Sequence, residues 1–225
     1  MHQQGHRARL RNQLETGGLD SFSDVQVLEH LLSFSIRRKD VKPLAYALLE
    51  QFGSLARVLD ASPEELQKVR GVGPHTAGLL SLMPQLFRRY SLSRNPDTPI
   101  LDSTEAICRY IQPYFIGCNE EQVYLVCMDA KCKVLDCRRL ASGGMNAVGV
   151  NLRKIVETVL QQHATMVVLA HNHPWGYALP SREDELITQE LQSALAPVDV
   201  RLADHVIVCE DECVSMAASG LLRRY

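Results

Sequence analysis

The chain has 225 residues, of which 46% are hydrophobic and 22% charged, a composition typical of one or two globular domains rather than of a disordered protein. No apolar run approaches the roughly 20 residues of a membrane helix, and residues 1–15 are polar and basic, unlike a signal peptide, so we expect a soluble, cytoplasmic protein without a membrane partner. The net charge of −2 is unevenly distributed: residues 1–95 carry 13 Lys and Arg against 9 Asp and Glu, and residues 96–225 carry 11 against 17. The first part is therefore better suited to approach a phosphate backbone.

Residues 1–90 carry only helical signals. Ser23 and Ser62 can each cap a helix that has an apolar face, and Ser62 is followed by proline and two acids in the first turn. Residues 91–99 are rich in proline and small polar residues and lack apolar periodicity. We therefore predict an all-α domain over residues 1–90 and a linker over residues 91–99.

A tight turn, Gly71-Val72-Gly73, separates two apolar-faced helical segments of this domain. Glycines permit a backbone conformation that leaves successive N–H groups free, and such a turn at a helix N-terminus can hold a DNA phosphate without reading bases. The basic neighbours of the turn are Lys68, Arg70 and His75. The turn predicts weak, salt-sensitive DNA binding; a packing hairpin without a ligand, or a protein-docking surface, explains the same residues.

From residue 100 onward, short apolar runs alternate with segments of helical spacing. The runs predicted as strands are 123–128, 134–135, 166–170 and 206–209. Helical spacing recurs over residues 155–160 and 186–195. This alternation predicts an α/β domain over residues 100–225, with helices packed against one sheet.

The seven cysteines favour neither a disulfide framework nor a cysteine-based zinc site. Their number is odd, and no two are spaced as Cys-x-x-Cys. We therefore expect reduced thiols.

The sharpest chemical signal is His171-x-His173, followed after seven residues by Ser181-x-x-Asp184. The predicted strand ends at Ala170, and because residues i and i+2 of a strand share a side, both imidazoles can converge on one point. Asp184 would face them from the first turn of a helix that begins near Ser181. Two imidazoles and one carboxylate satisfy Zn²⁺ and leave the fourth tetrahedral position open, as in catalytic sites. Ser-x-x-Asp is also a helix capping box, but the conjunction of all parts favours a metal site.

This spacing resembles the metal motif of the JAMM (JAB/MPN) metalloprotease fold. The flanking residues His-Asn-His-Pro-x-Gly, Pro-Ser-x-x-Asp and Asp204-His205 are similar specifically to the RadC family. The segments Phe52-Gly53-Ser54-Leu55 and Gly71-Val72-Gly73-Pro74 resemble the helix-hairpin-helix region of that family. The resemblance implies an N-terminal helix-hairpin-helix domain and a C-terminal α/β domain of JAB/MPN (cytidine-deaminase-like) type.

The resemblance also implies an activity, the hydrolysis of an amide or isopeptide bond in a protein or peptide substrate by a zinc-activated water. In RadC-like chains a glutamate at the start of an early strand is the general base, which selects Glu121; spacing alone does not separate it from its neighbour Glu120. Ser181 corresponds to the residue that stabilises the oxyanion. His205 either orients a ligand together with Asp204 or is a histidine at the edge of the core.

Two other features bear on the function. Trp175 stands where RadC chains usually have a small serine, and it either anchors the loop or lines the substrate cleft. The competing hypothesis is a DNA-associated accessory protein, historically labelled as a DNA-repair protein, whose metal site is structural or vestigial. A metal-dependent nuclease is disfavoured, because phosphodiester enzymes usually assemble two-metal sites. The sequence favours no particular oligomeric state.

Overall fold

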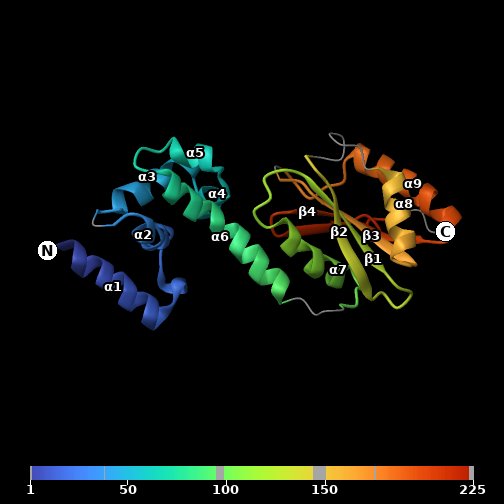
Figure 1. Ribbon diagram of the computed structural model, residues 1–225, viewed down its shortest axis with the longest axis horizontal. Coiled ribbons are helices and arrows are strands. Elements are labelled where there is room, and N and C mark those ends of the chain that lie inside the picture. The colour runs from blue at the N-terminus through green and yellow to red at the C-terminus, as the bar shows by residue number, and fades with distance from the viewer. Residues whose placement is uncertain (1, 38, 95–98, 144–150, 175, 223–225) are drawn as a thin grey trace. The chain divides into compact units, whose positions relative to one another are not determined.

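The computed structural model describes residues 2–37, 39–94, 99–143, 151–174 and 176–222. The chain divides into two compact units, Met1–Phe87 and Arg88–Tyr225, which are taken separately below (Figure 1). Within the described residues, no helix is both long and apolar enough to cross a lipid bilayer.

Helices make up the described part of the first unit, as the sequence predicts. They are α1 (His2–Gly17), η1 (Leu19–Ser21), α2 (Asp24–Ser35), α3 (Lys42–Phe52), α4 (Leu55–Asp60), α5 (Pro63–Gln67) and α6 (Pro74–Ser93). The core of this unit is made mainly of fully buried leucines, among them Leu28, Leu32, Leu48, Leu66 and Leu80.

The helix starts follow the predicted caps. The hydroxyl oxygens of Ser23 and Ser62 each accept a hydrogen bond from the third residue of the helix that follows, and both complete a capping box.

Two helices of this unit differ from expectation. Helix α1 was not predicted, because its sequence is polar and, among residues 8–17, Leu10 alone is a buried apolar side chain. Helix α6 continues to Ser93, into the segment predicted as a linker, and residues 95–98 lie outside the described residues.

The second unit is built on a mixed sheet that has five strands among the described residues, in the order β2-β1-β3-β4-β5. The strands are β1 (Gln122–Met128), β2 (Val134–Ser142), β3 (Met166–Asn172), β4 (Arg201–Cys209) and β5 (Glu212–Ser215). The helices are α7 (Thr104–Ile111), η2 (Gln112–Phe115), α8 (Leu152–Gln161), α9 (Arg182–Leu195) and η3 (Ala196–Val198). Strands β3 and β4 are parallel, and the other neighbours are antiparallel.

Helices cover both faces of this sheet (Figure 1). Leu169 of β3 shares one core with Ile155 of α8 and Leu191 of α9, whereas the preceding residue, Val168, shares the opposite core with Ile111 of α7. Successive residues of a strand point to opposite faces, so the continuous apolar run of β3 is that of a central strand buried on both sides. The predicted α/β architecture is confirmed.

The edge strands are less evident from the sequence. Strand β2 is longer than its predicted apolar run, because two adjacent exposed residues, Arg138 and Arg139, interrupt its apolar positions. Strand β4 likewise begins earlier, at Arg201, and the short edge strand β5 was not predicted. A period of two or a continuous apolar run is needed for prediction, and short edge strands offer neither.

The expectation of reduced thiols is wrong for one pair of cysteines. Cys108 of α7 and Cys213 of β5 form a disulfide, with their Cα atoms 5.9 Å apart. The two residues are 105 positions apart in the chain, so tertiary packing brings them together and no local spacing marks them. The other five cysteines are thiols.

Candidate metal centre

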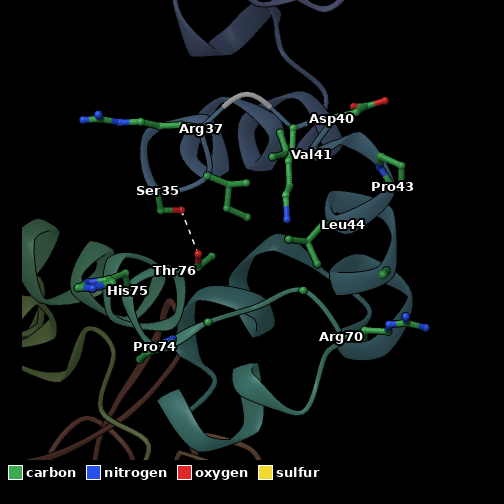
Figure 2. A pocket seen from close by; sticks show the side chains of 15 residues that line it. Ser35, Arg37, Asp40, Val41, Pro43, Leu44, Arg70, Pro74, His75 and Thr76 are labelled. Atoms are coloured by element: carbon green, nitrogen blue, oxygen red, sulfur yellow. Dashed lines mark hydrogen bonds between the residues drawn. The ribbon is translucent and has the colours of Figure 1, made fainter.

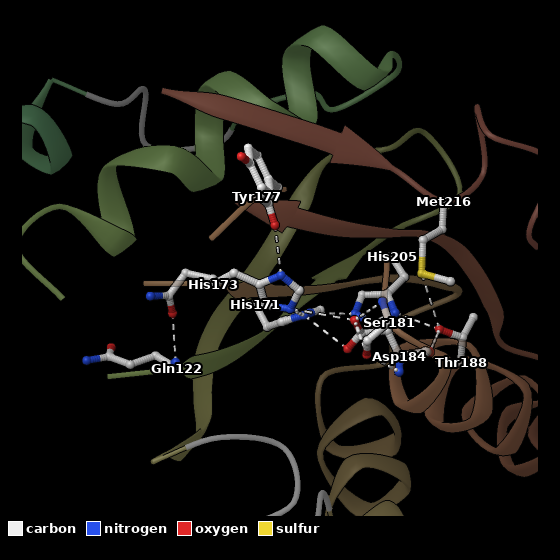
Figure 3. Close-up of polar contacts among 10 residues, drawn as sticks. Gln122, His171, His173, Tyr177, Ser181, Asp184, Thr188, His205 and Met216 are labelled. Atoms are coloured by element: carbon white, nitrogen blue, oxygen red, sulfur yellow. Dashed lines mark hydrogen bonds and ion pairs between the residues drawn. The ribbon is translucent and has the colours of Figure 1, made fainter. Parts of the chain in front are cut away.

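The carboxyl end of β3 carries the first two candidate ligands (Figure 3). The strand continues past the predicted end at Ala170, so that His171 lies within it and His173 follows directly. The N–H of His173 donates to the carbonyl oxygen of Val208 in β4 over 2.8 Å, which extends the strand pairing through His173. The extended backbone presents both imidazoles on one side.

Helix α9 supplies the third candidate ligand from its first turn. Ser181 is the N-cap: its hydroxyl oxygen accepts from the N–H of Asp184 over 3.1 Å, and Asp184 Oδ2 accepts from the N–H of Ser181 over 2.7 Å. The other carboxylate oxygen, Oδ1, lies 3.1 Å from His171 Nε2. Capping and metal ligation therefore use different oxygens of Asp184 and are compatible.

The three side chains converge at separations that fit one zinc ion. His171 Nε2 is 3.0 Å from His173 Nε2, and His173 Nε2 is 3.6 Å from Asp184 Oδ2. One ligand atom from each residue can be chosen so that all three lie within 4.8 Å of one another. Tetrahedral Zn²⁺, with bonds of about 2.0–2.1 Å, separates neighbouring ligand atoms by about 3.3 Å. His171 Nε2 makes the two separations closest to this value, 3.0 Å to His173 Nε2 and 3.1 Å to Asp184 Oδ1, so these three atoms suit one shared zinc ion.

A hydrogen bond to a backbone carbonyl sets the tautomer of His173 that can bind a metal. Its Nδ1 lies 3.1 Å from the carbonyl oxygen of Tyr177. A carbonyl can only accept a hydrogen bond, so Nδ1 carries the proton and Nε2 keeps its lone pair. That lone pair is the one on the side of His171 and Asp184.

A chain of buried hydrogen bonds sets the tautomer of the neutral His171 ring in the same way. The hydroxyl of Thr188 donates to the carbonyl oxygen of Asp184, so its oxygen accepts from Nδ1 of His205 over 2.6 Å. Nε2 of the neutral His205 ring then accepts from His171 Nδ1 over 2.9 Å. When His171 is neutral, its lone pair is therefore on Nε2, toward the candidate metal position; in the protonated ring Nε2 instead donates to Asp184 Oδ1 over 3.1 Å, and a metal bound here would replace that proton.

The environment also sets the charge of the buried groups. Burial lowers the pKa of His205 to about 3, and the charge of His171 adds to this effect, so His205 is neutral at neutral pH. Burial raises the pKa of the Asp184 carboxyl, but the hydrogen bond and charge of His171, with the hydrogen bonds from Ser181, outweigh it and hold the pKa below its ordinary value. Asp184 is therefore an ionised carboxylate, the form that binds a metal.

Glu121 directly precedes β1 at the same edge of the sheet. In the register of β1 and β3, Val123 lies opposite His171. Glu121 is two residues before Val123 and His173 is two residues after His171, so both lie just beyond the same end of the β1–β3 pairing. The register therefore places Glu121 at the same end of the sheet as the candidate ligands.

The neighbouring glutamate has a different environment. Glu120 is exposed, and its carboxylate accepts a hydrogen bond from the hydroxyl of Ser142 in β2 over 3.4 Å. The assignment of Glu121 rather than Glu120 as the general base stays a prediction.

Sequence reasoning missed two contributors to the centre. Thr188 lies one helical turn after Asp184, so the i,i+4 spacing offered a signal. Tyr177 contributes a backbone carbonyl, which no side-chain pattern reveals.

Of the two alternatives for His205, a pairing of its ring with the Asp204 carboxylate does not occur among the described contacts, and the ring bonds His171 and Thr188 instead. The carboxylate of Asp204 accepts instead from the Ser215 hydroxyl and from the N–H groups of His205 and Ala217, and its hydrogen bonds to Ser215 and Ala217 anchor the chain around the end of β5. Trp175 lies outside the described residues.

Comparison with protein families places this site in context. A model described as the RadC-like JAB domain matches residues 101–221, more than half of the chain and all of the candidate ligands, and a UPF0758 N-terminal model matches residues 1–78. The chain belongs to the RadC family. This confirms the resemblance noted in the sequence.

Relatives of this RadC-family chain are similar over almost its whole length. A UPF0758 protein of Methylibium petroleiphilum is 37% identical over 214 residues, covering 95% of this chain and 96% of that protein. UPF0758 proteins of Acidovorax ebreus and Leptothrix cholodnii are each 35% identical, over 229 and 214 residues, covering 96% and 95% of this chain and 96% of each relative. These names specify no reaction, so the chemistry of the RadC-family protein is argued from its site.

The hydrogen bonds behind the ligands predict an effect on metal affinity. We expect Thr188→Val, which keeps the side-chain shape but loses the acceptor for His205, to weaken zinc binding by about 10- to 100-fold, because residues that orient ligands contribute on this scale. Competition with a chelator of known affinity measures the change. Thr158→Val is the matched control, because the buried Thr158 hydroxyl makes the same i−4 bond, to Lys154, in α8. Equal zinc affinity in both variants would contradict the assignment.

Proposed function

We propose that this RadC-family protein is a zinc-dependent, metalloprotease-like hydrolase that cleaves an amide or isopeptide bond. The observation that carries the proposal is the convergence of the Nε2 atoms of His171 and His173 with the ionised carboxylate of Asp184. Three nitrogen and oxygen ligands with one open position are typical of catalytic zinc sites, whereas structural sites use four protein ligands, mostly cysteine. Among the described residues, no cysteine belongs to this ligand cluster.

Each residue has a distinct role in this proposal. Zn²⁺ held here would supply Lewis acidity, polarising the scissile carbonyl and lowering the pKa of a water molecule in its coordination sphere. Glu121 accepts a proton from the attacking water and passes it to the leaving amine nitrogen. His205 holds His171 in the ligating tautomer.

The proposed oxyanion role of Ser181 requires its hydroxyl proton to change partner. That hydroxyl donates to Asp184 Oδ2 over 2.7 Å, and a hydroxyl has one proton to donate. The N–H of Ser181 donates to the same oxygen, so Asp184 keeps a hydrogen bond when the hydroxyl rotates toward a substrate oxygen. Ser181 can therefore serve as a cap at rest and as an oxyanion donor during the reaction.

Metal-dependent cleavage tests the proposal. Zinc-loaded, chelator-treated and zinc-reloaded protein are incubated with a panel of peptides and lysine-linked isopeptides, and products are identified by mass spectrometry. We expect cleavage by the loaded and reloaded forms only. Failure of the protein to bind about one zinc per chain would overturn the proposal. Zinc binding without cleavage of either substrate class would favour the structural or vestigial site of the alternative hypothesis.

A second candidate function is weak nucleic-acid binding by the first unit, through a helix-hairpin-helix arrangement around the glycine turn. A cavity of about 620 Å³ borders Gly71 and Gly73 and is lined by four basic or potentially basic side chains, those of Arg37, Lys39, Arg70 and His75. Figure 2 shows the side chains of Arg37 and Arg70 extending outward from opposite sides of this cavity. Exposed cations around a glycine turn suit a passing phosphate backbone.

The turn differs from the expected run of free N–H groups. The N–H of Val72 donates to the carbonyl oxygen of Val69 over 3.0 Å, and the Val72 side chain is buried in the core. Val72 is therefore not a phosphate contact. The residues proposed to contact phosphate are Lys68, Arg70, Gly71 and Gly73.

Charge reversal tests this second function. We expect Lys68→Glu to weaken retention of duplex DNA at low salt and to reduce the slope of log affinity against log salt by about 1. Gly71→Asp is a poorer test, because Gly71 has φ +105° and any other residue strains the turn. Lys131→Glu, at an exposed position in the second unit, is the control. Equal retention by wild type and Lys68→Glu would remove the DNA-binding proposal.

A further inference from the structure

The side chain of Asn172 lies between the two histidine ligands in sequence but does not belong to the ligand set. Asn172 is the last residue of β3 and is 4% exposed. Its carboxamide contacts the segment that leads into β1 instead: Oδ1 accepts from the N–H of Gln122 over 2.7 Å, and Nδ2 donates to the carbonyl oxygen of Glu120 over 3.2 Å.

These two hydrogen bonds enclose Glu121. The carbonyl of Glu120 belongs to the peptide group before the Glu121 Cα atom, and the N–H of Gln122 belongs to the peptide group after it. One carboxamide thus holds both peptide groups that determine the direction of the Glu121 side chain. Two such bonds restrict the backbone torsions of Glu121 more than a single contact does.

The same two hydrogen bonds connect β3 to the segment before β1, beyond the point where the backbone pairing of β1 and β3 ends. The last residue pair of β1 and β3 at this edge is Val123 with His171. Beyond it, the connection between the ligand segment and the segment of Glu121 passes through the Asn172 side chain. The position of Glu121 is in this way tied to the strand end that carries the imidazoles.

We propose that Asn172 is a positioning residue, which fixes Glu121 relative to the metal ligands without touching the metal. The inference rests on the proposed function, because it needs Glu121 to act beside a metal. Asparagine suits the task, since its carboxamide combines an acceptor and a donor in one plane, whereas aspartate lacks the donor and serine is too short to bridge both peptide groups.

The test uses the Co²⁺-loaded full-length protein and needs no substrate. Cobalt reports its surroundings through its visible spectrum, and a carboxylate beside the open coordination position shifts the pH midpoint of the spectral change. We expect Glu121→Gln to move this midpoint and Asn172→Ser to move it in the same direction by at least roughly half as much, with unchanged cobalt content. In the double variant, Asn172→Ser should add no further shift, because it acts through Glu121.

Controls separate positioning from general destabilisation. Asn151→Ala removes a different asparagine contact, the cap of α8 at Lys154, and should leave the midpoint unchanged. Asn172→Leu, which keeps the branched shape and removes both hydrogen bonds, is the second variant, with folding checked by circular dichroism. An unchanged midpoint in folded Asn172 variants, or an equal shift in the Glu121→Gln background, would overturn the inference. Absent cobalt binding, or an unmoved midpoint in Glu121→Gln, is a separate result that rejects the metal or the general base and the inference with it.

Discussion

His171→Ala and Asp184→Ala are each expected to weaken zinc binding by more than about 100-fold, so that dialysis against a competing chelator removes the ion that the wild-type chain retains. Binding free energies of zinc sites are about 10–16 kcal/mol over the full ligand set, so losing one protein ligand costs about 3 kcal/mol, a weakening of more than about 100-fold. Asp184→Ala also removes the capping hydrogen bonds with Ser181 and should lower the free energy of unfolding by about a further 1 kcal/mol. Elemental analysis after dialysis measures the zinc.

Two variants serve as controls for this prediction. His75→Ala removes an exposed histidine, and Glu183→Ala removes an exposed acid in the same first turn of α9. Both should keep a full complement of zinc. Retention of zinc by His171→Ala and Asp184→Ala would mean that the metal is bound elsewhere.

Glu121→Gln is expected to keep zinc and lose hydrolysis, by about 10²- to 10⁴-fold, the usual contribution of a general base. The amide has almost the shape of the carboxylate but cannot accept the proton of the attacking water. Because Glu121 is outside the ligand set, the zinc content should match that of the wild type. The rate is measured on any substrate found in the peptide and isopeptide panel, and the inactive variant also serves to trap bound substrate.

Glu120→Gln is the matched control for the second prediction, because it makes the same chemical change one residue away. Its carboxylate pairs with Ser142, so its replacement should change the rate little. If both variants retain full activity, the assignment of the general base is wrong. If only Glu120→Gln is inactive, the assignment must move to that residue.

The elements with a strong local pattern were predictable from the sequence. Ser23 and Ser62 marked helix starts because a cap is a contact within four residues, and β3 was evident because a central strand is apolar throughout. Helix α1 and strand β5 were missed because neither has a strong apolar period. The disulfide between Cys108 and Cys213 was missed because only the packing of α7 near an edge strand brings them together.

The residues of the candidate site show the same difference between those with a local sequence pattern and those brought together by tertiary packing. His171, His173 and Asp184 could be found because one strand end and one helix start place them close together in the chain. The contacts that orient them were only partly predictable: His205 was one of two open alternatives, whereas the hydroxyl of Thr188 and the backbone carbonyl of Tyr177 were missed. The link from Asn172 to both sides of Glu121 depends on strand register, which the sequence does not display.

The coordination of zinc in the wild-type protein tests the central claim most directly. X-ray absorption at the zinc edge separates cysteine sulfur from nitrogen and oxygen ligands by distance, and scattering from the outer ring atoms counts the imidazoles. The two histidines and the aspartate predict nitrogen and oxygen neighbours at about 2.0–2.1 Å, with two imidazoles per ion. A sulfur neighbour at about 2.3 Å, or fewer than two imidazoles, would contradict it.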